Sequence, residues 1–255
     1  MMINSFMPEP LWLCFVFFYA ATIASFICLA VERLPHQLKW RDDANSNLTI
    51  WSPGSMCNSC GTKIRWLFLI PVLGYFFSKG KCYSCKERIP LTYPLTEALC
   101  GGICVAIFYF GNDFYKSSLL CCLFLTLTFL SLIDIKETWL PACVTFPLFW
   151  GGLLISPFAT DSDRIMGAFS AFCIIYFSMK FVSILKKEDL VAGGDVALAT
   201  AAGAWLGVSA TLLFLGVSSM VFILYSLPFR MKGITFVPMG PALSIGFFLC
   251  LLYLL

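Results

Sequence analysis

Long uncharged, apolar stretches dominate the chain, and each is close to the length that crosses a lipid bilayer. The clearest occupy residues 11–31, 117–133, 138–160 and 233–255. A hydrocarbon core about 30 Å thick needs roughly 20 predominantly apolar residues in a helix. Backbone surrounded by lipid must also satisfy its own hydrogen bonds, and a helix does so within one segment. The pattern therefore predicts membrane-spanning helices at these four places.

Three further apolar segments are less regular. Residues 94–111 carry a single acid, Glu97. Residues 165–179 are too few for a complete span, but the segment becomes long enough if the Lys180 side chain reaches the membrane interface. The uncharged run 196–229 is too long for one ordinary spanning helix. We split it near residues 203–207 into two short spans. The fold class is thus an all-α polytopic membrane protein with about eight transmembrane helices.

Composition supports the same class, because 60% of the residues are hydrophobic and only 12% are charged. A soluble domain of this size needs far more polar surface. The first apolar segment follows Glu9 and lacks a small-residue cleavage site, so we interpret it as a retained helix and not as a secretory signal. We expect an N-terminal transmembrane helix at 1–31, a small polar insert at 32–93 and a membrane-embedded domain of about seven helices at 94–255.

The basic residues indicate an orientation. With eight spans and the N-terminus on the periplasmic side, 15 of the 17 lysines and arginines fall inside, leaving only Lys116 and Arg164 outside. A single crossing by residues 196–229 would give a less favourable split of 13 to 4. The insert is therefore expected in the cytoplasm. Its basic excess is interleaved with acids and is explained by orientation, so the expected partner is the lipid bilayer and not nucleic acid.

Four of the 13 cysteines have the spacing of a metal site, Cys57-Asn-Ser-Cys60 and Cys82-Tyr-Ser-Cys85. Each short C-x-x-C turn can present two sulfurs to one ion, and two such turns complete a tetrahedral thiolate site. A cytoplasmic loop is a reducing environment, which disfavours disulfides. The alternatives are four unrelated thiols or a redox pair. We expect structural zinc, since protein ligands would fill all four positions.

Two acidic residues border apolar spans, where carboxylates are costly and point to function. Asp134 closes the third span and Asp195 opens the sixth, so the expected topology places both at the cytoplasmic boundary. Two carboxylates that share a water and a proton form the catalytic unit of aspartyl proteases. Gly193 and Gly194 would let a substrate backbone approach closely. The alternative is that each aspartate only caps a helix or pairs with a lysine.

Helix dipoles suggest roles for the pair, with Asp195 at a helix N-terminus as the base and Asp134 at a helix C-terminus as the acid. The only histidine, His36, excludes a histidine-based triad. Glu97 is a third unusual acid. It contacts substrate or a positive side chain in one interpretation, and has a plain interfacial role in the other.

Further motifs occur in a fixed order along nearly the whole chain. They are Arg33-Leu-Pro35, the first cysteine pair, Ile64-Arg65-Trp66, Ile70-Pro71-Val72-Leu73, the second cysteine pair, Ile89-Pro90, Tyr93-Pro94, Glu97, Ile133-Asp134 with Leu140-Pro141, Gly194-Asp195, Gly203-Ala204-Trp205-Leu206-Gly207 and Val237-Pro238-Met239-Gly240-Pro241. In this order the chain resembles the type IV prepilin leader peptidases that are also N-methyltransferases, which are intramembrane aspartyl proteases of the GxGD type.

The resemblance implies a bacterial inner-membrane enzyme that removes the leader of prepilins or pseudopilins at the cytoplasmic face. It also implies methylation of the new N-terminus with S-adenosylmethionine as the cofactor. By motif match, Asp134 and Asp195 are the catalytic pair and the four cysteines bind zinc. The alternatives are a non-catalytic membrane scaffold of a pilus or secretion system and a carrier that uses the two aspartates as a relay.

The chain departs from the family pattern at four positions. Ala192 replaces the first glycine of G-x-G-D, and Ala197 stands where a lysine is common. Ala142 and Lys136 replace frequent acids near the first aspartate. None of these departures removes a catalytic carboxylate, so we expect activity, with a narrower range of substrates.

Overall fold

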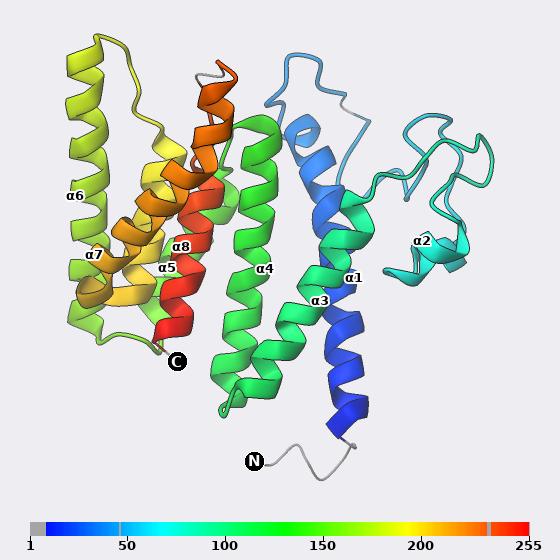
Figure 1. Cartoon of the computed structure of the whole chain (residues 1–255), viewed down its shortest axis with the longest axis horizontal. Coiled ribbons are helices and arrows are strands. Elements are labelled where there is room, and N and C mark those ends of the chain that lie inside the picture. Colours follow the sequence, from blue (N-terminus) through cyan, green and yellow to red (C-terminus); the bar gives the residue numbers. More distant parts are fainter. Residues whose placement is uncertain (1–8, 46, 234–235, 255) are drawn as a thin grey trace. The chain divides into compact units, whose positions relative to one another are not determined.

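The computed structural model describes residues 9–45, 47–233 and 236–254, and the described part is almost entirely helical (Figure 1). It consists of two compact units, Met1–Leu125 and Thr126–Leu255, whose boundary falls within one helix. Five helices are long and apolar enough to cross a membrane: α1 (Glu9–Gln37), α3 (Thr92–Phe110), α4 (Phe114–Glu137), α6 (Asp161–Lys186) and α7 (Gly193–Met231). Two shorter apolar helices are α5 (Ala142–Ile155) and α8 (Gly240–Tyr253). The polytopic helical fold is confirmed. The first eight residues lie outside the described part, and the predicted division at residues 31 and 93 stays a prediction.

In the first unit, α1 packs against α3 along a seam of small residues. Ala20, Ala21 and Ala24 of α1 are buried. Gly101 of α3 lies so close to Phe17 that a Cβ would stand 2.7 Å from its ring. Close approach of this kind is how helices associate in lipid, where no hydrophobic force draws them together.

The polar insert that links these helices is mostly irregular and contains only the 3-10 helix η1 (Trp66–Leu69) and the short helix α2 (Leu73–Phe77). Arg33, buried near the end of α1, holds the start of the insert. Its guanidinium donates hydrogen bonds to the carbonyls of Thr49 at 3.2 Å, Gly54 at 3.2 Å and Pro53. Five N–H donors in a rigid fork suit arginine to several carbonyls at once. The Arg33-Leu-Pro35 motif therefore fixes the insert to its helix.

In the second unit, α7 is bent sharply at Gly207 into two apolar arms. Gly207 has φ 75° and ψ 171°, which is outside the helical region and strained for a residue with a side chain. Figure 1 shows the two arms, 193–206 and 208–231, meeting at this bend. The predicted split of the long apolar run is thus confirmed, and the described chain has eight apolar helical segments.

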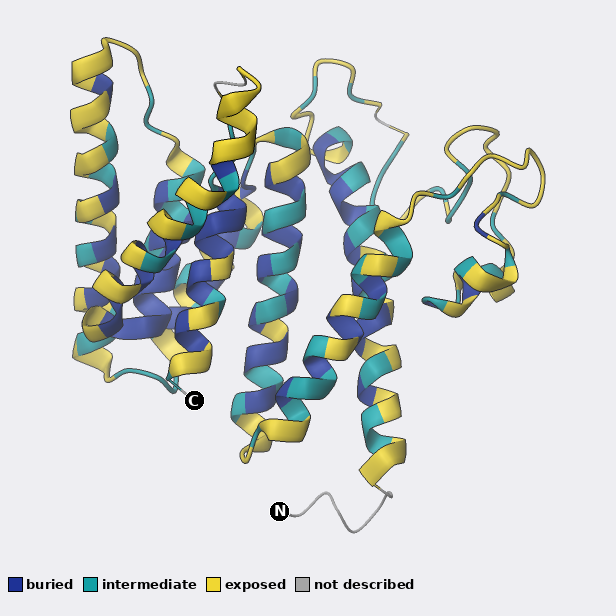
Figure 2. Ribbon diagram, viewed as in Figure 1, coloured by how far each residue is buried: buried dark blue, intermediate teal, exposed yellow. Residues whose placement is uncertain are grey.

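The first arm of α7 is mostly buried from residue 196 to residue 206 (Figure 2). It packs against α6 through two facing glycines. A Cβ on Gly203 would lie 2.3 Å from the carbonyl oxygen of Gly167, and a Cβ on Gly167 would lie 2.4 Å from that of Gly203. Only glycine at both positions lets the backbones come this close.

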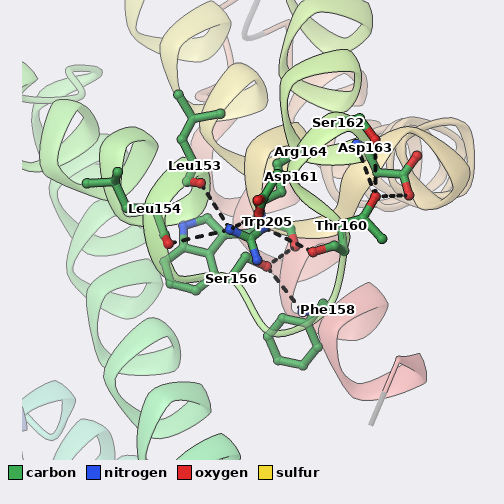
Figure 3. A network of polar contacts seen from close by, with 11 residues as sticks. Leu153, Leu154, Ser156, Phe158, Thr160, Asp161, Ser162, Asp163, Arg164 and Trp205 are labelled. Atoms are coloured by element: carbon green, nitrogen blue, oxygen red, sulfur yellow. Dashed lines mark hydrogen bonds and ion pairs between the residues drawn. The ribbon is translucent and has the colours of Figure 1, made fainter.

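A polar network closes the turn between α5 and α6 (Figure 3). Arg164 donates to the carbonyls of Leu153 at 3.1 Å, Leu154 at 3.4 Å and Ala159 at 3.0 Å, and it forms an ion pair of 3.0 Å with Asp161. The last carbonyls of a helix have no partner within that helix, and a cation there also favours the helix dipole. Arg164 thus caps the C-terminal end of α5 by binding its last carbonyls.

Trp205 ties the same turn to α7. Its indole N–H donates to the Leu148 carbonyl at 2.8 Å, and its own carbonyl accepts the Ser156 hydroxyl at 2.6 Å. Gly152 leaves room for the ring, since a Cβ there would lie 2.8 Å from it. The tryptophan of the Gly203–Gly207 motif therefore fixes α5 against the arm that carries Asp195.

Candidate active site and metal centre

Asp134 lies in the last turn of α4 and is only 4% exposed. The backbone N–H of Gly240, the first residue of α8, donates to its Oδ2 at 2.7 Å. Gly240 is also required sterically, because a Cβ there would lie 2.6 Å from the same oxygen. One carboxylate oxygen is thus fixed by a helix N-terminus, a favourable site for an acidic group.

Asp195 lies in the first turn of α7 and is half-buried. The charge of Asp134 acts on its carboxyl group, so the two carboxyl groups lie within electrostatic range of each other. The end of α4, the start of α7 and the start of α8 therefore meet at one end of the second unit. The structure brings the predicted pair together, and its catalytic role stays a prediction.

The residues before Asp195 have separate reasons for their small size. A Cβ on Gly194 would lie 2.9 Å from the Cβ of Leu140, so this glycine allows α7 to pack on the Leu140-Pro141 motif. Gly193 has open space around it, with nothing within 4 Å of a Cβ. Ala192 has φ −82°, which any residue adopts, so replacing the first glycine of the motif causes no backbone strain.

Tyr225, on the second arm of α7, is a neighbour of the pair that the sequence did not reveal. Its phenol interacts electrostatically with Asp134, and its ring packs against Phe229 with centroids 5.3 Å apart. A tyrosine near the end of an apolar span usually indicates an interfacial anchor. No signal in a single sequence distinguishes the two situations.

The four predicted cysteine ligands come together in the first unit. Their sulfurs all lie within 4.8 Å of one another, and the pairs Cys57–Cys85 and Cys60–Cys82 are 3.8 and 3.9 Å apart. A tetrahedral ion with sulfurs about 2.3 Å away requires sulfurs about 3.8 Å apart. The cluster could therefore hold a metal ion such as zinc.

The two cysteine turns have the same backbone design. The N–H groups of Gly61 and Lys86 donate to the carbonyls of Cys57 at 2.9 Å and Cys82 at 3.2 Å, and both donors have positive φ, 68° and 62°. A hydrogen bond with the Thr62 side chain lowers the pKa of the Cys60 thiol to about 6. Backbone hydrogen bonds lower the pKa of the Cys82 thiol as well. At Cys85 a backbone hydrogen bond is outweighed by desolvation and the neighbouring thiols, which raise the pKa of that thiol to about 12. A lowered pKa favours the thiolate, which is the form that binds metal.

Glu97 supports the insert in the first unit. Its buried carboxylate accepts the backbone N–H of Val72 at 2.7 Å. Val72 has φ 63°, an unfavourable value for a β-branched residue, and precedes α2. This contact gives Glu97 a structural role, and its predicted proximity to substrate stays a prediction.

Comparisons with known proteins cover most of the chain. The family model of the bacterial peptidase A24 N-terminal domain matches residues 18–110, and that of the type IV leader peptidase family matches residues 119–227. The chain is 32% identical to a prepilin leader peptidase/N-methyltransferase of Vibrio cholerae, over 88% of this chain and 90% of that protein. It is 31% identical to one of Aeromonas hydrophila, over 95% of this chain and 91% of that protein. No solved structure gives a significant match.

Proposed function

This chain belongs to the type IV leader peptidase family, and we propose that it cleaves the leader peptide of type IV prepilins or pseudopilins and N-methylates the new N-terminal residue. Asp134 and Asp195 form the catalytic dyad of this proposal. The similar proteins of Vibrio cholerae and Aeromonas hydrophila bear both activities in their name. The alternatives of a scaffold or a carrier lack such support.

The single observation that carries the proposal is the convergence of the two carboxyl groups at one end of the second unit. They are 61 positions apart in the chain, and three helix ends are needed to bring them together. Two carboxyl groups that lie close enough to act on each other disfavour double ionisation, which is the condition for the shared proton of the dyad mechanism.

Hydrolysis then follows from this arrangement. One ionised carboxylate takes a proton from a water molecule, whose oxygen adds to the carbonyl carbon of the scissile bond. The other carboxyl group, protonated, donates its proton to the carbonyl oxygen. The C–N bond breaks as the proton taken from water passes to the leaving amine, and one hydroxyl proton of the tetrahedral intermediate returns to the carboxylate that had acted as acid. The assignment of Asp195 as base and Asp134 as acid, expected from the dipoles of α7 and α4, stays a prediction. The hydrogen bond from the Gly240 N–H at the N-terminus of α8 to Asp134 acts against it.

The four cysteines, Cys57, Cys60, Cys82 and Cys85, would hold zinc as a structural ion. With all four positions filled by protein, the ion serves the fold of the insert and not the chemistry. The orientation from basic residues belongs to the proposal too, with the N-terminus periplasmic and the insert cytoplasmic in the inner membrane. The dyad would then face the cytoplasm.

S-adenosylmethionine would supply the methyl group that the new N-terminal amine accepts. The second unit has two apolar cavities, of about 400 and 270 Å³. Neither is lined by a carboxylate that could bind ribose hydroxyls. We therefore assign the methyl donor to neither cavity, and methylation is proposed from the family alone.

Co-expression of the full chain with a prepilin-like substrate tests the proposal. The mass of the product's N-terminus reports leader removal and the added methyl group together. Asp134→Asn and Asp195→Asn should each abolish cleavage while the protein still accumulates in the membrane. Asp189→Asn is the matched control, because Asp189 is an exposed acid in the loop before α7.

Normal cleavage by either dyad variant would refute the dyad. An uncut substrate in the presence of the accumulated wild-type chain would refute the peptidase and favour the scaffold. Cleavage without the added methyl group would leave the peptidase in place and remove the transferase.

A further inference from the structure

The polar insert of the first unit carries an apolar surface formed by η1 and α2. Trp66 is 77% exposed and Phe76 is 68% exposed. The exposed large apolar side chains of this short segment are Trp66, Leu67, Leu69, Leu73, Phe76 and Phe77. Single exposed apolar residues are ordinary, whereas a contiguous group marks an interaction surface.

The exposed side chains of α2 share one face. Phe76 and Phe77 follow Leu73 by three and four positions, which is the spacing of neighbours on a helix surface. Gly74 lies on the other side and packs so closely on η1 that a Cβ would stand 2.3 Å from the carbonyl oxygen of Phe68. The segment therefore has a packed inner side and an apolar outer side.

A hydrogen bond fixes the depth of this segment beside α3, one of the candidate spans. The 19 residues of α3 rise about 28 Å, close to the hydrocarbon thickness, so Thr92 lies at the membrane boundary. Glu97 lies five residues further on, about 7.5 Å inside the span, and its carboxylate accepts the Val72 N–H at 2.7 Å. The helix α2 begins at the next residue. It therefore starts beside the membrane-embedded part of α3, where lipid covers an outward-facing apolar side chain.

Trp51 gives an independent measure of the same depth. Its ring is 80% exposed, and its centroid lies 5.9 Å from that of Phe26 on α1. Phe26 precedes Val31, the last residue of the uncharged stretch of α1, by five residues, which is again about 7.5 Å. Tryptophan is enriched at this level of a bilayer. The insert thus reaches the membrane-embedded part of both helices that it links.

Basic side chains flank the apolar surface. Between positions 63 and 88 the chain has six lysines and arginines and a single acid, Glu87. Lys63 and Arg65 precede η1, Lys79 and Lys81 follow α2, and all four are exposed. Segments that lie in the membrane interface bury an apolar face about 5–10 Å deep and place their cations at anionic headgroups. The depth of about 7.5 Å falls within this range.

We propose that η1 and α2 form an in-plane membrane anchor, with Trp66 and Phe76 among the lipid acyl chains and Lys79 and Lys81 at the phosphates of anionic lipids. Trp51 is a second point of insertion, on the α1 side. The anchor holds the four-cysteine cluster at the membrane surface, because the second cysteine pair follows it directly in the chain. This inference goes beyond the proposed peptidase function and does not depend on it.

Photocrosslinking of the full chain in lipid vesicles tests the anchor, since benzophenone inserts into the C–H bonds of acyl chains. Benzoylphenylalanine in place of Phe76 should give lipid adducts on irradiation, detected by mass, and so should the same analogue in place of Trp66. Leu38 is the matched control position. It is an exposed apolar residue that follows α1, beyond the charged Glu32 and Arg33. Lipid adducts there should be several-fold fewer.

An equal yield of lipid adducts at positions 76 and 38 would overturn the anchor. Adducts at position 76 with a second copy of the chain in place of lipid would overturn it too, because the apolar surface would then be a protein interface. Thermal unfolding like that of the wild type shows that a variant is folded. The analogue at position 66 decides the question if the one at position 76 misfolds.

Vesicles of phosphatidylcholine with a minor share of phosphatidylglycerol test the basic side chains. Phosphatidylglycerol should form a larger share of the adducts at position 76 than of the vesicle. Lys79→Gln combined with Lys81→Gln should lower this excess, by up to about fivefold for each lysine, the attraction of one cation to an anionic surface. Lys39→Gln is the matched control, because Lys39 is also exposed and has φ 54°, against 53° for Lys79. An unchanged excess in the double variant would refute the contact with anionic headgroups.

Discussion

Gly240→Ala is the substitution that most directly tests how the protein holds its first aspartate. The Cβ would lie 2.6 Å from Oδ2 of Asp134, whereas ordinary van der Waals contact begins at 3.4 Å. The carboxyl group must therefore retreat by about 0.8 Å, or α8 must shift by a similar distance. In either case the 2.7 Å hydrogen bond from the Gly240 N–H is weakened or lost.

The magnitude follows from these two effects. A misplacement near 1 Å at a catalytic group costs about 100-fold in rate. Loss of a hydrogen bond to a charged group costs about 1.5–3 kcal/mol of stability. We therefore expect kcat for leader cleavage to fall about 100-fold and the free energy of unfolding to fall by about 1–3 kcal/mol.

The assay is cleavage of a synthetic prepilin-like peptide by the purified protein in detergent, together with thermal unfolding of the protein in that detergent. Gly216→Ala is the matched control, because Gly216 lies exposed on α7 with nothing within 4 Å of a Cβ. It should keep full activity, and alanine should stabilise the helix slightly. A Gly240→Ala protein that unfolds and cleaves like the wild type would refute the role of α8 in placing Asp134.

Three other substitutions test the remaining parts of the structure. Cys82→Ser should lose the bound metal, about one ion per chain measured by elemental analysis, and unchanged metal content would contradict the four-thiolate site. Lys86→Gly should stabilise the metal-bound insert by about 1 kcal/mol, because its φ of 62° favours glycine; slower release of metal to a chelator measures this, and faster release would contradict it. Gly194→Ala should lower the melting temperature, because its Cβ would lie 2.9 Å from Leu140, whereas Gly193→Ala should leave it unchanged; equal melting temperatures would show that Gly194 does not control packing.

Hydrophobicity predicted the number of apolar helical segments in the described residues well and their ends poorly. The apolar run 138–160 contains a helix of only 14 residues, α5, because Pro141 precedes it and the turn after it is held by Arg164. Apolarity reports where the chain meets lipid or core, and not which of those residues are helical. The bend at Gly207 was placed correctly, since a glycine pair interrupted a run too long for one span.

The candidate site was predictable as far as it depends on side chains that are rare in their surroundings. Asp134 and Asp195 are costly in an apolar context, and the cysteine pairs have a characteristic spacing. The hydrogen bond from Gly240 to Asp134 could not be predicted from the sequence, because every residue except proline has a backbone N–H that could donate it. The proximity of Tyr225 to Asp134 could not be predicted from the sequence either, since it depends on the direction that the second arm of α7 takes after the bend at Gly207.

The glycines near the two aspartates show how a motif can be placed correctly and yet be interpreted incompletely. From sequence, Gly193 and Gly194 were both assigned to the approach of a substrate backbone. In the structure Gly194 is small because Leu140 packs against it, and Gly240 is small because Asp134 does. Both contacts fix helices that carry or hold the carboxyl groups. Of the three, only Gly193 faces open space, so a substrate contact through glycine has to be sought at that position alone.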